Sequence, residues 1–115
     1  MALKIIEHGS AEYQKMVGLR DNVLRKPLGL IFTPDELEGE KENILIGAFE
    51  DDDILGCCML VEENSRVIRL RQMAVLNNLQ GKGVGRAIMN FAENIARDRG
   101  YKVLSMHARK NATGF

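Results

Sequence analysis

Apolar residues recur along the second half of the chain with two spacings, and the change of spacing marks the expected elements. Residues 44–50 and 54–61 are short apolar runs separated by consecutive aspartates, which predicts an antiparallel hairpin. A third strand is expected over residues 67–75. From about residue 84 to 99 the apolar positions follow helical spacing, and Gly100 ends that helix.

The first half mixes a strand with two helices. Residues 3–7 form a short apolar strand, and Ser10 is placed to cap a helix that runs to about Arg25. Thr33 followed by Pro34 and two acids predicts the start of a second, short helix.

Two further segments complete the expected order. The charged run at residues 40–42 is interpreted as a solvated turn, and residues 101–108 as a last strand. The predicted order is therefore β-α-α-β-β-β-α-β.

Composition restricts the protein class. The chain has 115 residues, of which 45% are hydrophobic and 28% charged, as expected for a single globular domain over residues 1–115. The formal net charge is zero, so no basic stripe favours nucleic acid or an anionic membrane. No apolar run approaches the roughly 20 residues of a membrane span, and the start does not resemble a signal peptide. We expect a cytoplasmic protein with neither nucleic acid nor membrane as partner.

Two local clusters are interpreted as structural. Cys57 and Cys58 are adjacent, which suits two buried strand residues better than a disulfide. The aspartates at 51–53 lack the glycine and distal glutamate of a calcium loop and are expected at a hairpin tip. No metal site is predicted.

The segment from Gln80 to Gly85 has the clearest functional pattern. Gly81, Gly83 and Gly85 alternate, so backbone amides there are open to a ligand, and the loop leads directly into a helix. Free amides and the positive end of a helix dipole together bind phosphate. Lys82 and Arg86 add positive charge beside the loop.

Three phosphate-binding patterns compete for this loop. A Walker P-loop needs Lys followed by Ser or Thr, but Gly83 follows Lys82. A dinucleotide fingerprint needs Gly or Ala where Arg86 or Ile88 stands. The third pattern, Q/R-x-x-G-x-G/A, is matched at every position from Gln80 to Gly85.

On these residues the sequence resembles the GNAT (Gcn5-related N-acetyltransferase) superfamily over its whole length. Residues 80–85 resemble its motif A, and residues 69–75 resemble the fourth strand that precedes it. Residues 101–108 resemble the fifth strand, and residues 110–115 the start of motif B, which we interpret as the beginning of a helix.

The resemblance implies an α/β (α+β) fold with a mixed, mostly antiparallel sheet and helices on both faces. Strands four and five run parallel and splay apart, and acetyl-CoA lies in the splay. Main-chain groups of Met73 and Val75 pair with the pantetheine arm, the loop amides take the pyrophosphate, and Asn111 reaches the cofactor from the far side. The implied cofactor-binding residues are Met73, Ala74, Val75, Gln80, Gly81, Lys82, Gly83, Val84, Gly85, Arg86 and Asn111.

The implied activity is N-acetyl transfer from acetyl-CoA to a small-molecule or peptide amine by direct attack, with no covalent nucleophile and no metal. His107 is the candidate proton acceptor, with Glu62 and Glu63 as weaker candidates. A non-catalytic acyl-CoA-binding module is the alternative. A dinucleotide-binding protein is disfavoured by the glycine spacing.

The resemblance departs from the family at the C-terminus. Family members usually continue through a helix and two further strands, and many have a tyrosine just after the position of Phe115; Tyr13 and Tyr101 do not match it. We expect either a truncated piece of a longer enzyme, which we favour, or a short variant that completes its sheet with a partner. Either predicts a homodimer or segment exchange through the exposed C-terminal edge.

The acceptor region is expected between residues 24 and 42. Leu28, Leu30, Ile31 and Phe32 either line an acceptor pocket or belong to the core, and the core is the favoured interpretation. The sequence does not identify the acceptor.

Overall fold

The computed structural model describes residues 1–106 and 112–114, and its strands form one six-stranded sheet in the order β1-β2-β3-β4-β5-β6. All neighbouring strands are antiparallel except β4 and β5, which are parallel, so the predicted mixed sheet is confirmed. The strands are β1 (Ala2–Ile6), β2 (Ile44–Glu50), β3 (Asp53–Glu62), β4 (Val67–Val75), β5 (Val103–Met106) and β6 (Ala112–Gly114).

Both predicted helix starts are confirmed by their caps. The Ser10 side chain accepts a hydrogen bond from the Tyr13 amide, and the Thr33 side chain accepts one from the Glu36 amide. The helices are α1 (Ala11–Arg20), extended by a π turn (Asp21–Arg25) and a 3-10 turn (Lys26–Leu28), then α2 (Pro34–Glu38) with a 3-10 turn (Gly39–Glu42), and α3 (Val84–Asp98). A 3-10 turn (Asn77–Leu79) joins β4 to the glycine loop.

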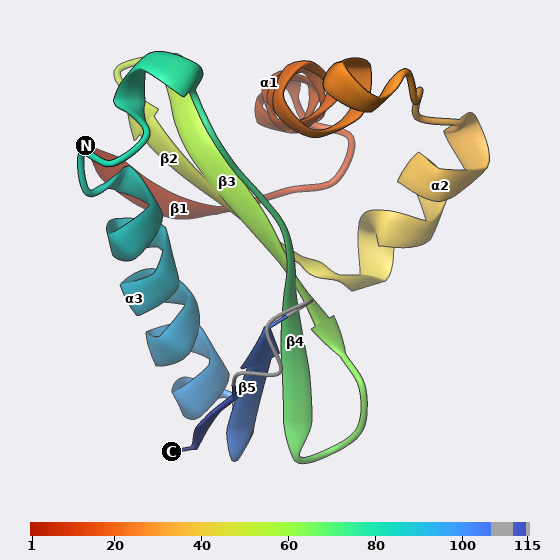
Figure 1. Cartoon of the computed structure of the whole chain (residues 1–115). Helices are drawn as coiled ribbons and strands as arrows, with labels where there is room; N and C mark the ends of the chain where they lie inside the picture. Colours follow the sequence, from red (N-terminus) through yellow and green to blue (C-terminus); the bar gives the residue numbers. More distant parts are fainter. Residues whose placement is uncertain (107–111, 115) are drawn as a thin grey trace.

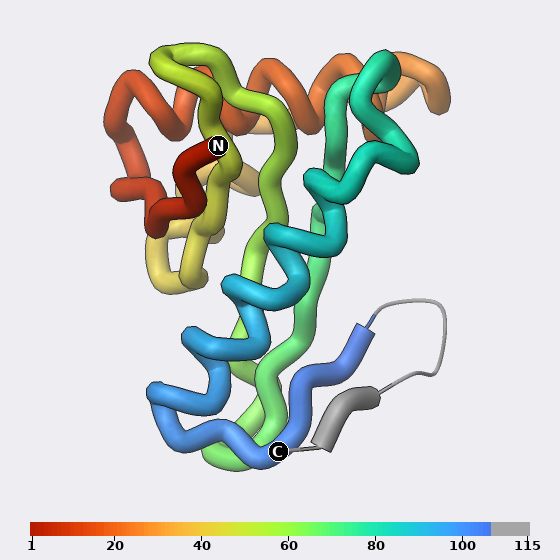
Figure 2. Tube along the Cα trace, turned by 90° about the vertical axis from the view of Figure 1, so that its left-hand side faces the viewer, coloured from red at the N-terminus to blue at the C-terminus, as the bar shows by residue number. Residues whose placement is uncertain are grey.

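Helices cover both faces of the sheet, as predicted. Figure 1 shows α3 on one side and both α1 and α2 on the other, and Figure 2 shows α3 crossing in front of the central strands. Successive strand residues point to opposite faces, so the apolar runs of β2 and β3 supply two cores. Ile46 packs in the core under α3, whereas its neighbour Leu45 packs in the core under α1.

The adjacent cysteines show the same alternation. Cys57 lies in the core beside α1 and Cys58 in the core beside α3, both are fully buried, and neither is in a disulfide. Their predicted role as small buried strand residues is confirmed.

The prediction that residues 110–115 begin a helix is wrong for the described residues, 112–114. Residues 112–114 form strand β6, antiparallel to β5, and not the start of a helix. The outer edge beside β5 is therefore occupied by β6. The local sequence suited a helix, but pairing along the open edge of β5 satisfies the backbone of this segment instead.

Two predictions for the first half are also wrong. Glu40 is not in a solvated turn, because only 7% of its surface is exposed and it binds Arg20. His8 is half-buried, and its Nε2 lies 2.7 Å from the Leu37 carbonyl oxygen. The core interpretation of the apolar run after α1 fails for Leu28, Leu30 and Ile31, whose side chains are 72%, 48% and 76% exposed, whereas Phe32 is half-buried.

Candidate functional site

The glycine loop connects β4 to α3 through backbone conformations that favour glycine. Gly81 has φ of 81° and Gly83 has φ of 92°, in the left-handed region. Gly83 is the N-cap of α3, and no side chain caps that helix end. The first amides of α3 are therefore left without the usual capping acceptor.

Some amides of the glycine loop donate hydrogen bonds within the protein, and others are available to a ligand. The Lys82 amide donates to the Leu79 carbonyl oxygen at 3.2 Å. Within the described part of the chain, no backbone acceptor is found for the amides of Gly81, Gly83 and Gly85. A cavity of about 440 Å³ lies against them, lined by the three glycines and Arg86. The positive end of the α3 dipole and the Arg86 guanidinium both favour an anion there.

A β-bulge interrupts β4 just before the loop. Arg71 lies opposite Met59 and Ala74 opposite Cys57, so Gln72 and Met73 together face a single residue of β3. Gln72 has φ of 57°, which is rare for a residue with a side chain. Nothing in the sequence marks this bulge, because no glycine or asparagine stands there.

A second cavity, of about 780 Å³, lies where β4 and β5 separate. The described pairing of the two strands ends at Leu70 and Met106. The residues that line the cavity are Leu24, Leu70, Arg71, Gln72, Met73, Gly85, Met89 and Met106. We call this cavity the groove. Gly85 lines both the groove and the loop cavity, so the two adjoin.

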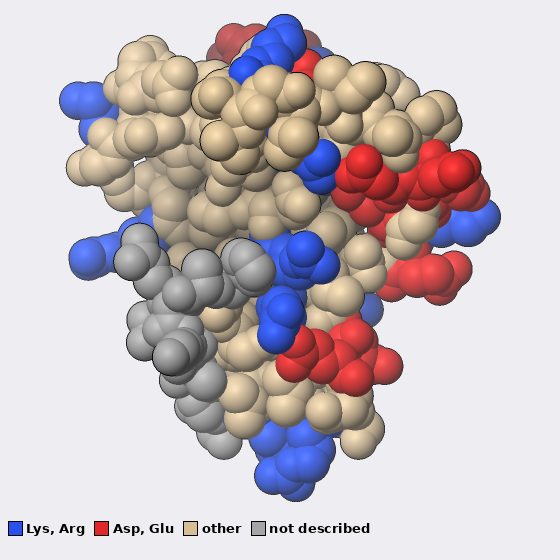
Figure 3. Space-filling model, turned by 45° about the vertical axis from the view of Figure 1, so that its right-hand side comes forward, with Lys and Arg blue, Asp and Glu red and all other residues tan. Residues whose placement is uncertain are grey.

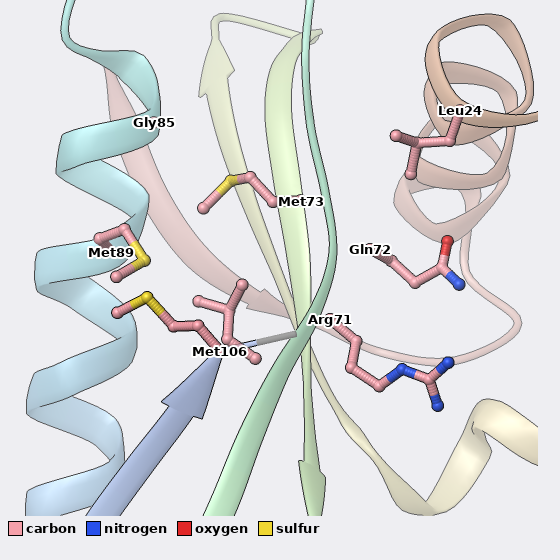
Figure 4. A pocket seen from close by; sticks show the side chains of 8 residues that line it. Leu24, Arg71, Gln72, Met73, Gly85, Met89 and Met106 are labelled. Carbon is pink, nitrogen blue, oxygen red and sulfur yellow. The ribbon is translucent and has the colours of Figure 1, made fainter. Parts of the chain in front are cut away.

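The groove has an apolar side and a polar side. Figure 4 shows Met73, Met89 and Met106 on the side of β4 that faces α3. Arg71 and Gln72 extend from β4 in the opposite direction, toward the side where Leu24 lies. Of the groove residues, only Met73 and Gly85 are among the predicted site residues. Leu24 lies at the start of the expected acceptor region, residues 24–42. The others were missed, because helical and strand spacing do not reveal which side chains meet across a gap between elements.

The remaining predicted residues have different positions. Ala74 and Val84 are buried at 2% and 6% exposure, so their side chains belong to the cores. The Gln80 side-chain amide donates to the Val75 carbonyl oxygen at 3.1 Å, so in this structure it braces the loop. The Lys82 side chain is exposed. His107 and Asn111 lie outside the described residues.

Neither tyrosine and neither weaker base candidate lines the groove. The Tyr13 hydroxyl donates to Glu40 at 2.7 Å, and burial is the largest cause of its raised pKa. The Tyr101 hydroxyl donates to Glu62. Glu62 and Glu63 lie beside the start of β4, whereas the glycine loop follows its end.

The cysteine thiols are unsuited to nucleophilic chemistry. Burial raises the pKa of Cys57 to about 12 and also raises the pKa of Cys58. Both thiols therefore stay protonated at neutral pH. Residues 1–106 contain no group of three or more His, Cys, Asp or Glu side chains placed to hold a metal ion. In the same part of the chain, every helix is too short or too polar to cross a membrane.

Comparison with known families decides the affiliation. A family model described as acetyltransferase (GNAT) family matches residues 11–115. The chain belongs to the GNAT acetyltransferase family. The motif resemblance and the fold class predicted from it are confirmed.

Several solved structures share this fold. Rv2747 from Mycobacterium tuberculosis, in complex with CoA, is 21% identical, with a TM-score of 0.74 over 92% of this chain and 63% of that one. An aminoglycoside 6'-N-acetyltransferase complexed with coenzyme A is 15% identical, with a TM-score of 0.77 over 92% of this chain and 61% of that one. A putative N-acetyltransferase from Lactobacillus plantarum is 22% identical, with a TM-score of 0.77 over 94% of this chain and 76% of that one. The chain thus spans less than two thirds of the length of the first two.

Proposed function

We propose that this GNAT chain binds acetyl-CoA across the two adjoining cavities and transfers the acetyl group to an amine by direct attack. The observation that carries the proposal is the position of Gly85. It lines the loop cavity, which favours an anion, on one side and the largely apolar groove on the other. A CoA ester has the same division, with a pyrophosphate at one end of its pantetheine arm and an acyl thioester at the other.

The loop would hold the pyrophosphate. The amides of Gly81, Gly83 and Gly85 are available, and Arg86 lies at the same cavity. The Lys82 amide is used by Leu79, so Lys82 would contribute only the charge of its exposed side chain, whereas the Val84 amide at the helix start would join those of the glycines.

The pantetheine arm and the thioester would lie along β4. The bulge turns the strand beside the groove, where main-chain groups of Met73, Ala74 and Val75 would pair with the arm. Gln80 would keep the end of the strand in place through its bond to Val75. Asn111 would approach from the far side of the cofactor. A main-chain amide near Val75 would polarise the thioester carbonyl.

The amine must lose a proton, and we propose His107 as the acceptor. Met106, the preceding residue, lines the groove. A His107→Gln variant should lose the acidic limb of the pH profile of kcat/KM near the ordinary histidine pKa of about 6.5. An unchanged profile would assign proton removal to water.

The proposed cofactor is tested by thermal melting with acetyl-CoA, with CoA, and with NAD as control. A ligand at about 100 times its Kd adds roughly 2.7 kcal/mol to the folded state, which raises Tm by several degrees. We expect a rise with both CoA compounds and none with NAD. A rise with NAD alone would overturn the proposal.

Thiol release separates the enzyme from the alternative, a non-catalytic acyl-CoA-binding module. Neither Tyr13 nor Tyr101 lies at the groove. Their hydroxyls donate hydrogen bonds to Glu40 and Glu62, respectively. Binding of acetyl-CoA without release of CoA in the presence of amines would favour the module.

Self-association through the C-terminal edge, proposed from the sequence, is tested by light scattering over a range of protein concentrations.

A further inference from the structure

The bulge in β4 changes which side chains reach the groove. In a regular strand, consecutive residues point to opposite faces. At the bulge, Arg71 and Gln72 are consecutive, yet Figure 4 shows both extending away from α3, while Met73 turns toward it. A guanidinium and a carboxamide are thereby placed together at the side of the groove near Leu24.

Arg71 differs from three nearby arginines in having no carboxylate partner among the described residues. Three other arginines, in α1, in the turn after it and in β4, are each within ion-pair distance of an acid: Arg20 with Glu40 at 2.6 Å, Arg25 with Glu36 at 2.9 Å and Arg69 with Glu63 at 2.7 Å. No ion pair of Arg71 occurs among the described residues. Figure 3 shows acidic and basic side chains lying beside one another on the face that carries α2.

An exposed arginine on a flat surface needs no partner, but Arg71 lies at a cavity. Its guanidinium offers planar pairs of donors that match an anionic oxygen group such as carboxylate or phosphate. Gln72 adds a neutral donor and acceptor next to it. Leu24, from the turn after α1, supplies an apolar wall on the same side.

We propose that Arg71, assisted by Gln72, is the specificity-determining residue for the acceptor, and that the acceptor is an amine bearing a carboxylate or phosphate. This inference rests on the proposed function, because it assigns the polar side of the groove to the amine and the methionine side to the acyl-CoA. Amino acids and phosphorylated amines belong to this class. Polyamines do not, because their second cationic group would meet the Arg71 charge.

Binding of acceptor probes to the CoA-saturated chain tests the proposal without requiring turnover. The probes are L-amino acids paired with the matching L-amino acid amides, and phosphoethanolamine paired with ethanolamine. We expect at least one anionic probe to raise the Tm of the CoA-saturated protein and its neutral analogue to have no effect. The pair that responds identifies carboxylate or phosphate as the group recognised.

Two variants link the effect to Arg71. Arg71→Gln should abolish the shift by the anionic probe while the shift by CoA itself remains, and Arg71→Lys should restore part of it. Arg66→Gln is the matched control, because Arg66 is an exposed arginine in the turn before β4 and lines neither cavity. A purely structural role of Arg71 would change the Tm without ligands and leave the preference for the anionic probe intact.

The results that overturn the inference are also distinct. Equal shifts by anionic and neutral probes, an unchanged preference in Arg71→Gln, or no shift by any probe would each refute it. If the proposed function itself were wrong, neither CoA nor acetyl-CoA would shift the Tm before an acceptor is added.

Discussion

Arg20 and Glu40 form a bidentate ion pair inside the protein. Arg20 Nη1 donates to Glu40 Oε1 at 2.9 Å, and Nη2 donates to Oε2 at 2.6 Å. Arg20 is fully buried, and the Phe32 ring lies 4.7 Å from its guanidinium carbon. The pair connects the end of α1 to the turn after α2. It therefore fixes the segment between them, which passes beside the polar side of the groove.

Glu40→Gln should be strongly destabilising, because it leaves the buried Arg20 charge without its counter-ion. Removing one partner of a buried pair costs about 3–5 kcal/mol, which corresponds to a Tm drop of more than about 10 °C. Glu42→Gln, an exposed residue of the same turn, is the control and should change Tm very little. Similar losses in urea unfolding of the two variants would show that the pair adds nothing to stability.

Gly85→Ala separates cofactor binding from folding. Gly85 is in the first turn of α3, and a Cβ there would meet only Val75 Cγ2 at 3.9 Å, an ordinary contact. Alanine is a better helix former by about 1 kcal/mol, so we expect an unchanged or higher Tm without ligand. The methyl group would enter the space shared by the two cavities and weaken CoA binding, measured by calorimetry.

Gly83→Ala is the comparison for that experiment. Its φ of 92° is strained for any side chain, although its Cβ would meet no atom within 4 Å. We expect this variant to lose roughly 1–2 kcal/mol of stability. Weaker CoA binding in the Gly83 variant alone would contradict a cavity shared at Gly85.

Arg86→Gln should weaken CoA binding several-fold, because the variant loses a cation at the cavity that would hold the pyrophosphate. The dependence of affinity on salt concentration should also become shallower. Calorimetric titrations at low and high salt measure both effects. Arg99→Gln, at the far end of α3, is the control; an equal loss there would indicate a general charge effect.

The protein should become less stable in alkaline solution because of its buried thiols. Burial raises the pKa of Cys57 to about 12, whereas a thiol in the unfolded chain titrates near 8.5. Above about pH 8.5 the unfolded state releases a proton that the folded state retains, so the free energy of unfolding falls as pH rises. Each such thiol contributes about 1.4 kcal/mol per pH unit, and Cys58 adds to the slope in the same direction.

Urea unfolding between about pH 7 and pH 10 measures this slope. Cys57→Ala should be less stable at pH 7, yet its stability should fall less steeply with pH because one titrating group is absent. An identical slope in the variant would exclude Cys57 as a source. Tyr13, whose pKa burial also raises, should contribute only above the ordinary tyrosine value of about 10.

Most of the elements and the glycine loop could be predicted from the sequence, because the signals for both are local. The Ser10 and Thr33 caps act within one helical turn, and the glycines of the loop specify their own backbone conformations. The alternation of buried residues in β2 and β3 also follows from strand geometry.

Which side chains meet across different elements could not be predicted, because it depends on long-range contacts. Glu40 reads as a surface residue until the α1 and α2 segments bring it to Arg20, and residues 112–114 pair with β5 where their local pattern suited a helix. The bulge at Gln72 depends on the register between β3 and β4, which the sequence of either strand does not specify. The polar side of the groove, with Arg71 unpaired in the described chain, is set by that bulge and by the separation of β4 from β5, because register and splay are long-range properties.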